Sequence, residues 1–327
     1  MVLLVDPAPA GQKSLSTVKI AQFSGPMSPR SEAPIHTERD APGALIAFVA
    51  LAYLISWAWL LPVAINGPDV VPGVGWPTHV PALLGPMAAA LLVVGHTEGR
   101  AGVLDMLHRM VSVRHPLRWW AVALSPVLLL SAVGMAVVAG WTSTDLAGLA
   151  QFSGIPSGWG AAGVVATVVL VNGFGEETGW RGYAQPLLQR HHGPLLATLG
   201  VSAIWALWHL PMLAVLASFR SFGPATLMGW TIGLLSGAVV LAWLYNRSGG
   251  SILLAAVWHG GFNLVTATAV GAGFLEAAAT VLVIVGASAL VLTELVRTRS
   301  GHPSILLATR ASSPPGRLTT LRSSHVP

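Results

Sequence analysis

Residues 43–65 have the sequence GALIAFVALAYLISWAWLLPVAI, which contains no charged side chain. A hydrocarbon core about 30 Å thick needs roughly 20 residues of helix to cross it, because each residue advances the helix by about 1.5 Å. The apolar residues form one long run rather than an alternating or helically periodic pattern. This segment therefore predicts a helix that spans a membrane.

The rest of the chain repeats this character. Apolar segments occur at residues 80–95, 119–141, 160–175, 194–217, 225–245, 252–271 and 275–296. The 327 residues are 54% hydrophobic and 9% charged, whereas roughly a quarter of the residues of a soluble domain are charged. We predict an all-α fold, a polytopic transmembrane helical bundle with about eight spans.

The positions of the basic residues predict the orientation of this bundle. If both termini are cytoplasmic, every Lys and Arg except Arg220 falls on the cytoplasmic side, as short inner loops require. The outer loops then lie around Asp69, Asp145 and Gly271. We expect a multi-pass protein of the cell membrane. The basic residues form no stripe with stacking aromatic residues, so a nucleic-acid partner is not expected.

The composition divides the chain into five parts. An N-terminal tail (1–41) and a basic C-terminal tail (299–327) are rich in Pro and Ser and are expected to be disordered. Between them lie the N-terminal transmembrane helices (42–158), a core that carries the polar motifs (159–272) and a last transmembrane helix (273–298). The chain has no cysteine, which excludes thiolate catalysis and cysteine-ligated metals.

Polar residues inside the predicted spans form three short motifs. Ionisable side chains are costly at membrane depth unless they are paired or face water, so each is a functional candidate. In the first motif, Glu177 and Arg181 stand four residues apart, on one helix face, where they can pair. Glu176 is turned about 100° away and is available for chemistry. An interfacial cluster that merely ends a span is the alternative interpretation.

The other two motifs lie in the fifth and seventh predicted spans. His209 is flanked by apolar residues and needs a hydrogen-bond partner inside the bundle, for which a carboxylate is the obvious choice. His259 and Asn263 are four residues apart on one helix face, from which both can point at a single atom. Packing and interhelical hydrogen bonds are the alternative explanation for both motifs.

One shared cavity explains all three motifs together. A carboxylate base, a histidine that helps to activate water and donors for an oxyanion are the parts of a peptidase. The hypothesis is hydrolysis of a peptide bond near the cytoplasmic membrane face, in a peptide or membrane-protein substrate within the lipid bilayer.

The motifs resemble those of the CAAX protease and bacteriocin-processing (CPBP, also Abi) family of membrane proteases, which includes the type II prenyl-protein endopeptidases. The family's Glu-Glu-x-x-x-Arg is matched by Glu176, Glu177 and Arg181. Its aromatic-x-x-x-His is matched by Trp205 and His209, with Trp in place of the commoner Phe, and its His-x-x-x-Asn by His259 and Asn263. The resemblance covers residues 160–271.

The resemblance implies an eight-span intramembrane endopeptidase and a role for each motif residue. Glu176 and His209 would activate water, His259 and Asn263 would stabilise the oxyanion, and Glu177 with Arg181 would shape the site. This mechanism requires no cofactor. Zinc is the alternative, because Glu176, His209 and His259 offer a two-His, one-carboxylate ligand set, although the His-Glu-x-x-His spacing of a single-helix zinc site is missing.

Two other classes of function compete with proteolysis. A non-catalytic membrane scaffold or bacteriocin self-immunity protein would use the same buried groups to bind a partner. A transporter would need a path across the whole bilayer, and the lack of ionisable residues in the first three predicted spans argues against it.

Overall fold

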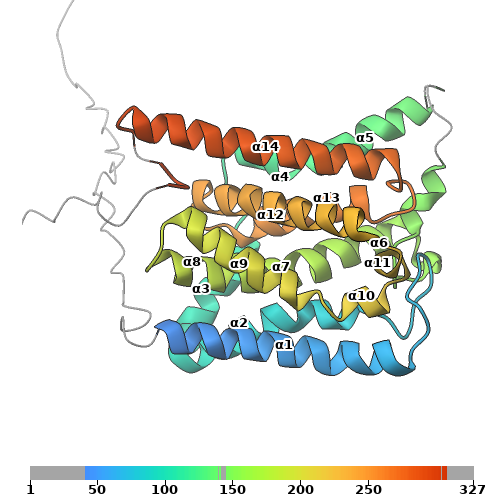
Figure 1. Cartoon of the computed structure of the whole chain (residues 1–327), viewed down its shortest axis with the longest axis horizontal. Coiled ribbons are helices and arrows are strands. Elements are labelled where there is room, and N and C mark those ends of the chain that lie inside the picture. Colours follow the sequence, from blue (N-terminus) through green and yellow to red (C-terminus); the bar gives the residue numbers. More distant parts are fainter. Residues whose placement is uncertain (1–40, 139, 141–144, 303, 308–327) are drawn as a thin grey trace, which may run out of the picture. The chain divides into compact units, whose positions relative to one another are not determined.

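The computed structural model describes residues 41–138, 140, 145–302 and 304–307 (Figure 1). Regular secondary structure within these residues is helical, and β-structure is limited to isolated bridges between loops. The all-α prediction is confirmed. The predicted N-terminal tail, except its last residue, and residues 308–327 of the predicted C-terminal tail lie outside the described residues.

The elements follow one another along the chain with short connections. They are α1 (Ala41–Asn66), η1 (Val80–Leu84), α2 (Gly85–Thr97), α3 (Gly99–Val111), α4 (Leu117–Ala123), α5 (Ser125–Val138), η2 (Leu146–Ala150), η3 (Ser157–Trp159), α6 (Gly160–Thr167), η4 (Val168–Gly173), α7 (Phe174–Gly179), η5 (Trp180–Ala184), α8 (Gln185–Gln189), α9 (Pro194–Trp208), α10 (Met212–Val215), α11 (Ala217–Arg220), α12 (Pro224–Arg247), α13 (Ile252–Thr266) and α14 (Phe274–Arg299). η4 and η5 are π-helical turns within one continuous helical stretch.

Six helical stretches are long and apolar enough to cross a membrane. They are Pro42–Asn66, Val80–Thr97, Ser157–Gln189, Pro194–Val215, Pro224–Arg247 and Phe274–Arg299. The pair Leu117–Ala123 and Ser125–Ala136, bent by 63°, makes a seventh if it counts as one span. The short apolar helix α13 coincides with the remaining predicted segment. This is a multi-pass membrane protein, and the prediction of about eight spans agrees with it.

The fourth predicted span is longer than its sequence suggested. We predicted its end at residue 175, but the helical stretch continues to Gln189 and carries the first polar motif in its interior. The charges did not end the helix because Glu177 and Arg181 neutralise each other, with Nη1 of the guanidinium 3.1 Å from the carboxylate Oε1. Both side chains are completely buried.

The two ends of the helical bundle differ in charge. Arg247 and Arg297 lie in the last turns of α12 and α14, at one end. The opposite end holds the connection after α1, where Asp69 forms an ion pair with Arg220 of α11. The only basic residue that the sequence places outside is thus bound to an acidic residue of a predicted outer loop. We call these the arginine-rich end and the Asp69 end.

Part of the predicted C-terminal tail is packed against the helices. Leu306 is fully buried, and its carbonyl accepts a hydrogen bond from the backbone N–H of Leu195, at 2.8 Å. The backbone N–H of Ile305 donates to Glu294 of α14, also at 2.8 Å. Residues 304–307 therefore belong to the folded bundle, because they satisfy polar groups of α9 and α14.

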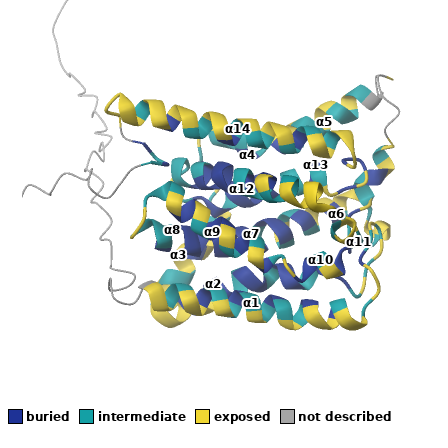
Figure 2. Ribbon diagram, viewed as in Figure 1, coloured by how far each residue is buried: buried dark blue, intermediate teal, exposed yellow. Residues whose placement is uncertain are grey.

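The buried centre of the bundle surrounds α7 and α13, whereas α1 and α14 carry much exposed surface (Figure 2). Small residues allow α7 to approach its neighbours closely: a Cβ at Gly179 would lie 2.6 Å from Cβ of Pro86 on α2. Such contacts are typical of membrane helices, where packing replaces the hydrophobic effect between helices. They fix the helical stretch that bears the first polar motif in the middle of the bundle.

Candidate active site

Glu177 lies at the centre of a buried charged triad. Its Oε1 accepts from Nη1 of Arg181 at 3.1 Å, and Nδ1 of His259 lies 2.8 Å from the same oxygen. The Arg181 guanidinium also stacks over the Trp205 ring, 4.8 Å from its centroid, which is a favourable cation–π geometry. Glu177 therefore connects α7, η5 and α13 and fixes the orientation of the His259 ring.

Glu176 points to a different set of partners, as the turn of about 100° between adjacent helical residues requires. Its Oε2 accepts a hydrogen bond from the indole Nε1–H of Trp205 on α9, at 2.6 Å. The carbonyl of Trp205 lies 2.8 Å from Nδ1 of His209. One tryptophan thus positions both groups, and the expectation of a carboxylate partner for His209 gives way to this backbone contact.

A cavity of about 220 Å³ joins the three motifs. Glu176, His209, His259 and Asn263 all line it, although they come from α7, the end of α9 and α13. Glu177 and Arg181 do not line the cavity but lie behind His259 and Trp205. The structure thus brings together, around one cavity, the four side chains that the sequence analysis assigned to chemistry. The two residues that were expected to shape the site lie outside the cavity wall.

The hydrogen bonds determine which ring nitrogens can act in the cavity. A carbonyl only accepts, so Nδ1 of His209 carries a proton, and in the neutral ring Nε2 has the free lone pair. Nδ1 of His259 likewise donates to Glu177. A second proton on Nε2 of His259 would make an imidazolium, whose counter-charge is the Glu177 carboxylate. His209 thus fits a base and His259 fits a donor.

Three further residues of the cavity wall with an ionisable or amide side chain were missed by the sequence analysis. They are His79 before η1, Asn172 of η4 and Glu276 of α14. Burial and, to a smaller extent, the neighbouring His209 lower the pKa of His79 to about 4, so this ring is neutral at physiological pH. Asn172 is four residues before Glu176, so the helical period places both residues on one face and could have identified Asn172. No spacing in the sequence links His79 to the site.

The cavity opens toward the Asp69 end of the bundle. Ser153, Phe222 and Ala267, which line it, belong to the connections at that end, and Glu276 lies in the first turn of α14. None of its lining residues belongs to the described connections at the arginine-rich end, which follow α8, α12 and α14. Which end is cytoplasmic decides whether this agrees with the predicted site near the cytoplasmic face.

The proposed zinc ligands do not form a metal site in this geometry. Within the described part of the chain, no three His, Asp or Glu side chains are grouped closely enough to hold a metal ion. Glu176 is engaged by the Trp205 indole, while His259 is engaged by Glu177. We therefore derive no catalytic step through a metal.

The fold and cavity define a class of protein: a polytopic membrane protein that encloses a polar pocket between its helices. Residues 158–265, which include all three motifs, match the family model described as "Type II CAAX prenyl endopeptidase Rce1-like". The chain is also 24% identical over 192 residues to CAAX prenyl protease 2 of Methanococcus maripaludis, an alignment that covers 57% of this chain and 69% of the relative. Over these residues the chain is similar to the CAAX proteases, and both matches support a membrane protease of that kind.

Proposed function

We propose that this chain is an intramembrane endopeptidase in which Glu176 and His209 activate a water molecule, while His259 and Asn263 stabilise the oxyanion. The observation that carries the proposal is the cavity that all four side chains line, from three separate helical stretches. The family match supports proteolysis in general. The assignment of roles rests on the hydrogen bonds of each group.

The proposed reaction proceeds through one tetrahedral intermediate. Glu176 takes a proton from water, whose oxygen attacks the carbonyl carbon of the peptide bond, and Nε2 of His209 orients this water through its lone pair. The oxyanion accepts hydrogen bonds from Nε2–H of His259 and the Asn263 amide. When the carbon–nitrogen bond breaks, its electron pair goes to the amide nitrogen, which receives the proton from Glu176.

Glu177 and Arg181 act as positioning residues in this scheme. The Glu177 carboxylate holds Nδ1 of His259 and supplies the negative charge that an imidazolium needs. Arg181 neutralises Glu177 and supports the Trp205 ring, whose indole in turn holds Glu176. One buried ion pair thereby orients both halves of the proposed site.

We also propose the side from which the substrate enters. Cytoplasmic ends of membrane proteins accumulate Arg, so the arginine-rich end and both termini are assigned to the cytoplasm. The cavity opens at the other end, among the connections near Ser153, Phe222 and Ala267. The substrate class that fits is a peptide, or a segment of a membrane protein, presented from the extracytoplasmic face.

Purified protein in detergent tests the chemistry. We expect cleavage in a peptide library that includes prenylated and unmodified sequences, and loss of that cleavage in Glu176→Ala and His209→Ala. A metal chelator is expected to leave the activity unchanged. Cleavage that survives both substitutions would instead favour a scaffold or self-immunity role, and cleavage that stops with the chelator and returns with zinc would favour the metal mechanism.

The absence of cysteine allows a separate test of orientation. Ser218 lines the cavity at the Asp69 end, and Ser300 follows α14 at the arginine-rich end. In intact cells, a membrane-impermeant thiol reagent is expected to label Ser218→Cys and to leave Ser300→Cys unlabelled until the cells are opened. The opposite pattern would place the cavity mouth in the cytoplasm and would leave the proposed chemistry intact.

A further inference from the structure

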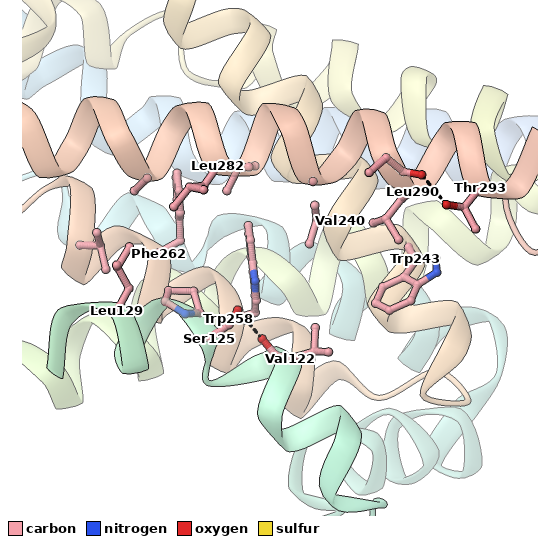
Figure 3. A pocket seen from close by; sticks show the side chains of 16 residues that line it. Val122, Ser125, Leu129, Val240, Trp243, Trp258, Phe262, Leu282, Leu290 and Thr293 are labelled. Atoms are coloured by element: carbon pink, nitrogen blue, oxygen red, sulfur yellow. Dashed lines mark hydrogen bonds between the residues drawn. The ribbon is translucent and has the colours of Figure 1, made fainter. Parts of the chain in front are cut away.

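A second cavity, apolar and of about 500 Å³, lies between α14 and the helices α5, α12 and α13 (Figure 3). Its wall includes Val240, Phe262, Leu282 and Leu290, together with Gly286 of α14. α14 is the least buried of the long apolar stretches, with 11% of its window inside the protein, so the cavity belongs to the lipid-facing side of the bundle.

This apolar groove continues into a smaller basic cavity of about 300 Å³ at the arginine-rich end. Trp243, Leu290 and Thr293 line both cavities. The basic cavity adds Arg118, Arg247 and Arg297, which come from α4, α12 and α14. The two cavities therefore form one path with an apolar length and a basic end.

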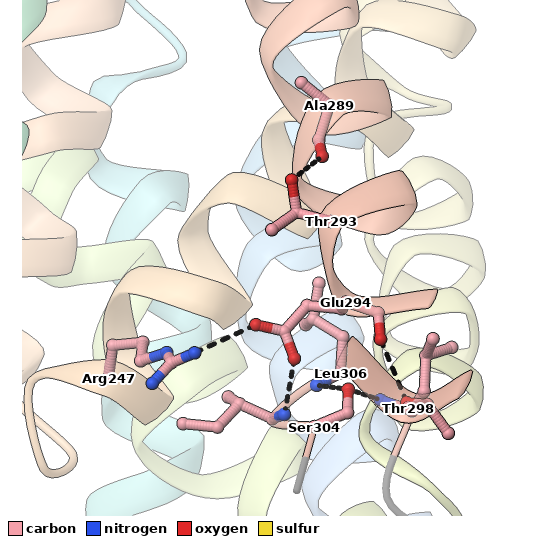
Figure 4. A network of polar contacts seen from close by, with 9 residues as sticks. Arg247, Ala289, Thr293, Glu294, Thr298, Ser304 and Leu306 are labelled. Carbon is pink, nitrogen blue, oxygen red and sulfur yellow. Dashed lines mark hydrogen bonds and ion pairs between the residues drawn. The ribbon is translucent and has the colours of Figure 1, made fainter. Parts of the chain in front are cut away.

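The single acidic side chain in the basic cavity is already fully used by the chain itself (Figure 4). Oε1 of Glu294 accepts from Arg247 at 2.9 Å, and Oε2 accepts from the backbone N–H of Ile305 at 2.8 Å. Arg118 lies over the Trp119 ring. Among the described residues, neither Arg118 nor Arg297 has an acidic partner, and Nε of Arg297 is buried without a hydrogen-bond acceptor.

We propose that this path binds one anionic phospholipid, with an acyl chain in the apolar groove and the phosphate between Arg118 and Arg297. A groove that faces the bilayer interior is surrounded by acyl chains, which match its apolar wall. Guanidinium groups bind phosphate through several parallel hydrogen bonds. Basic pockets between membrane helices on the cytoplasmic side are typical binding sites for anionic lipid headgroups.

The lipid would contact the helix that carries both proposed oxyanion donors. Trp258 and Phe262 line the groove and also the catalytic cavity, and their rings stack with centroids 5.4 Å apart. A bound acyl chain would press on this aromatic pair from the lipid side. The lipid site itself rests on the basic residues and the groove, and does not depend on the proposed proteolysis.

Native mass spectrometry of the full chain tests the proposal. Protein reconstituted in phosphatidylcholine vesicles, with or without phosphatidylglycerol, is extracted in mild detergent and weighed with its retained lipid. We expect retained phosphatidylglycerol in preference to phosphatidylcholine. Arg118→Gln and Arg297→Gln should each weaken retention about fivefold, the usual contribution of one basic residue beside anionic lipid. Arg297→Lys should restore most of it.

Gly286→Leu blocks the groove without altering any charge. A Cβ at Gly286 meets no atom within 4 Å, so the larger side chain enters the apolar cavity and should displace the acyl chain. Gly229→Leu on α12 is the matched control, because its Cβ also meets open space and the residue lines neither cavity. Arg100→Gln, exposed on α3, is the charge control.

Two results with the lipids would overturn the proposal. One is equal retention of the two lipids by the unaltered protein. The other is retention of phosphatidylglycerol by Gly286→Leu and by both arginine variants at the level of the controls. If inorganic phosphate alone prevents retention of the lipid at millimolar concentration, the basic end binds a free anion rather than a phospholipid, and the proposal also fails.

Discussion

The candidate catalytic cavity and the apolar groove share one wall but differ in almost every other respect. The aromatic pair Trp258 and Phe262 lines both. On the cavity side lie Glu176, Glu276 and three histidines, whereas the groove side has no ionisable residue along its length. Helix α13 is thus polar on one face and apolar on the next.

This difference arises because adjacent residues of an α-helix point in directions about 100° apart around the helix axis. His259 follows Trp258, and Asn263 follows Phe262, so each polar residue is turned about 100° from an aromatic one. The two polar residues are four apart, and so are the two aromatic residues, which therefore form two parallel stripes. One helix thereby separates a polar cavity from an apolar groove.

Removing the carboxylate of Glu176, which lies on the cavity side of α13, should have the largest effect on peptide cleavage. Glu176→Gln keeps the shape of the side chain but removes the proposed base, and we expect kcat for peptide cleavage to fall about 10²- to 10⁴-fold. Glu98→Gln, at the end of α2 and away from the cavity, is the control. Similar activity of both variants in a steady-state assay would contradict the role of Glu176.

Breaking the buried charge triad should mainly affect stability. Glu177→Gln leaves the Arg181 charge buried without its counter-ion, and the free energy of unfolding should fall by about 3–5 kcal/mol. Asp105→Asn is a close control, since Asp105 and Arg109 have the same spacing but are partly exposed, and its effect should stay below about 1 kcal/mol. Equal effects in a detergent-based unfolding assay would show that burial does not strengthen the pair.

Removing an oxyanion donor should lower turnover without weakening substrate binding. For Asn263→Ala we expect a decrease in kcat of about 10²- to 10³-fold with little change in KM, because the donor acts on charge that develops in the transition state. Asn246→Ala, at the end of α12, is the control. A rise in KM at constant kcat would assign Asn263 to substrate binding instead.

Changing the shared wall should have the smallest effect. Phe262→Leu removes the stacked contact with Trp258, for which we expect a loss of about 0.5–1.5 kcal/mol in stability. Activity should change by less than about tenfold, because about 1.4 kcal/mol corresponds to a factor of ten. A loss of activity as large as that of Asn263→Ala would show that the wall takes part in catalysis rather than separating two environments.

Much of this architecture could be predicted from the printed residues. The eight apolar segments, the ion pair of Glu177 with Arg181 and the common direction of His259 and Asn263 all follow from run length and helical spacing. The end of the fourth predicted span could not be found in this way. Hydropathy counts each charge as a cost, but Glu177 and Arg181 neutralise each other inside the helix.

The remaining features depend on contacts between distant parts of the chain. His79 is 130 positions before His209 in the numbering, yet both line one cavity. Helix packing also determines the hydrogen bonds of Trp205 and the direction in which the cavity opens. It likewise brings three arginines, from α4, α12 and α14, into one cavity. Spacing within one helix specifies only which residues share a face.

The printed residues are enough to predict that this protein crosses a membrane several times, that its polar residues form three motifs and that its basic residues gather at one end. Run length, helical period and charge distribution are local properties, which each segment carries alone. Packing of the helices settles which polar groups meet and which end of the bundle the cavity opens toward. Those relations exist only after separate helices have packed against one another.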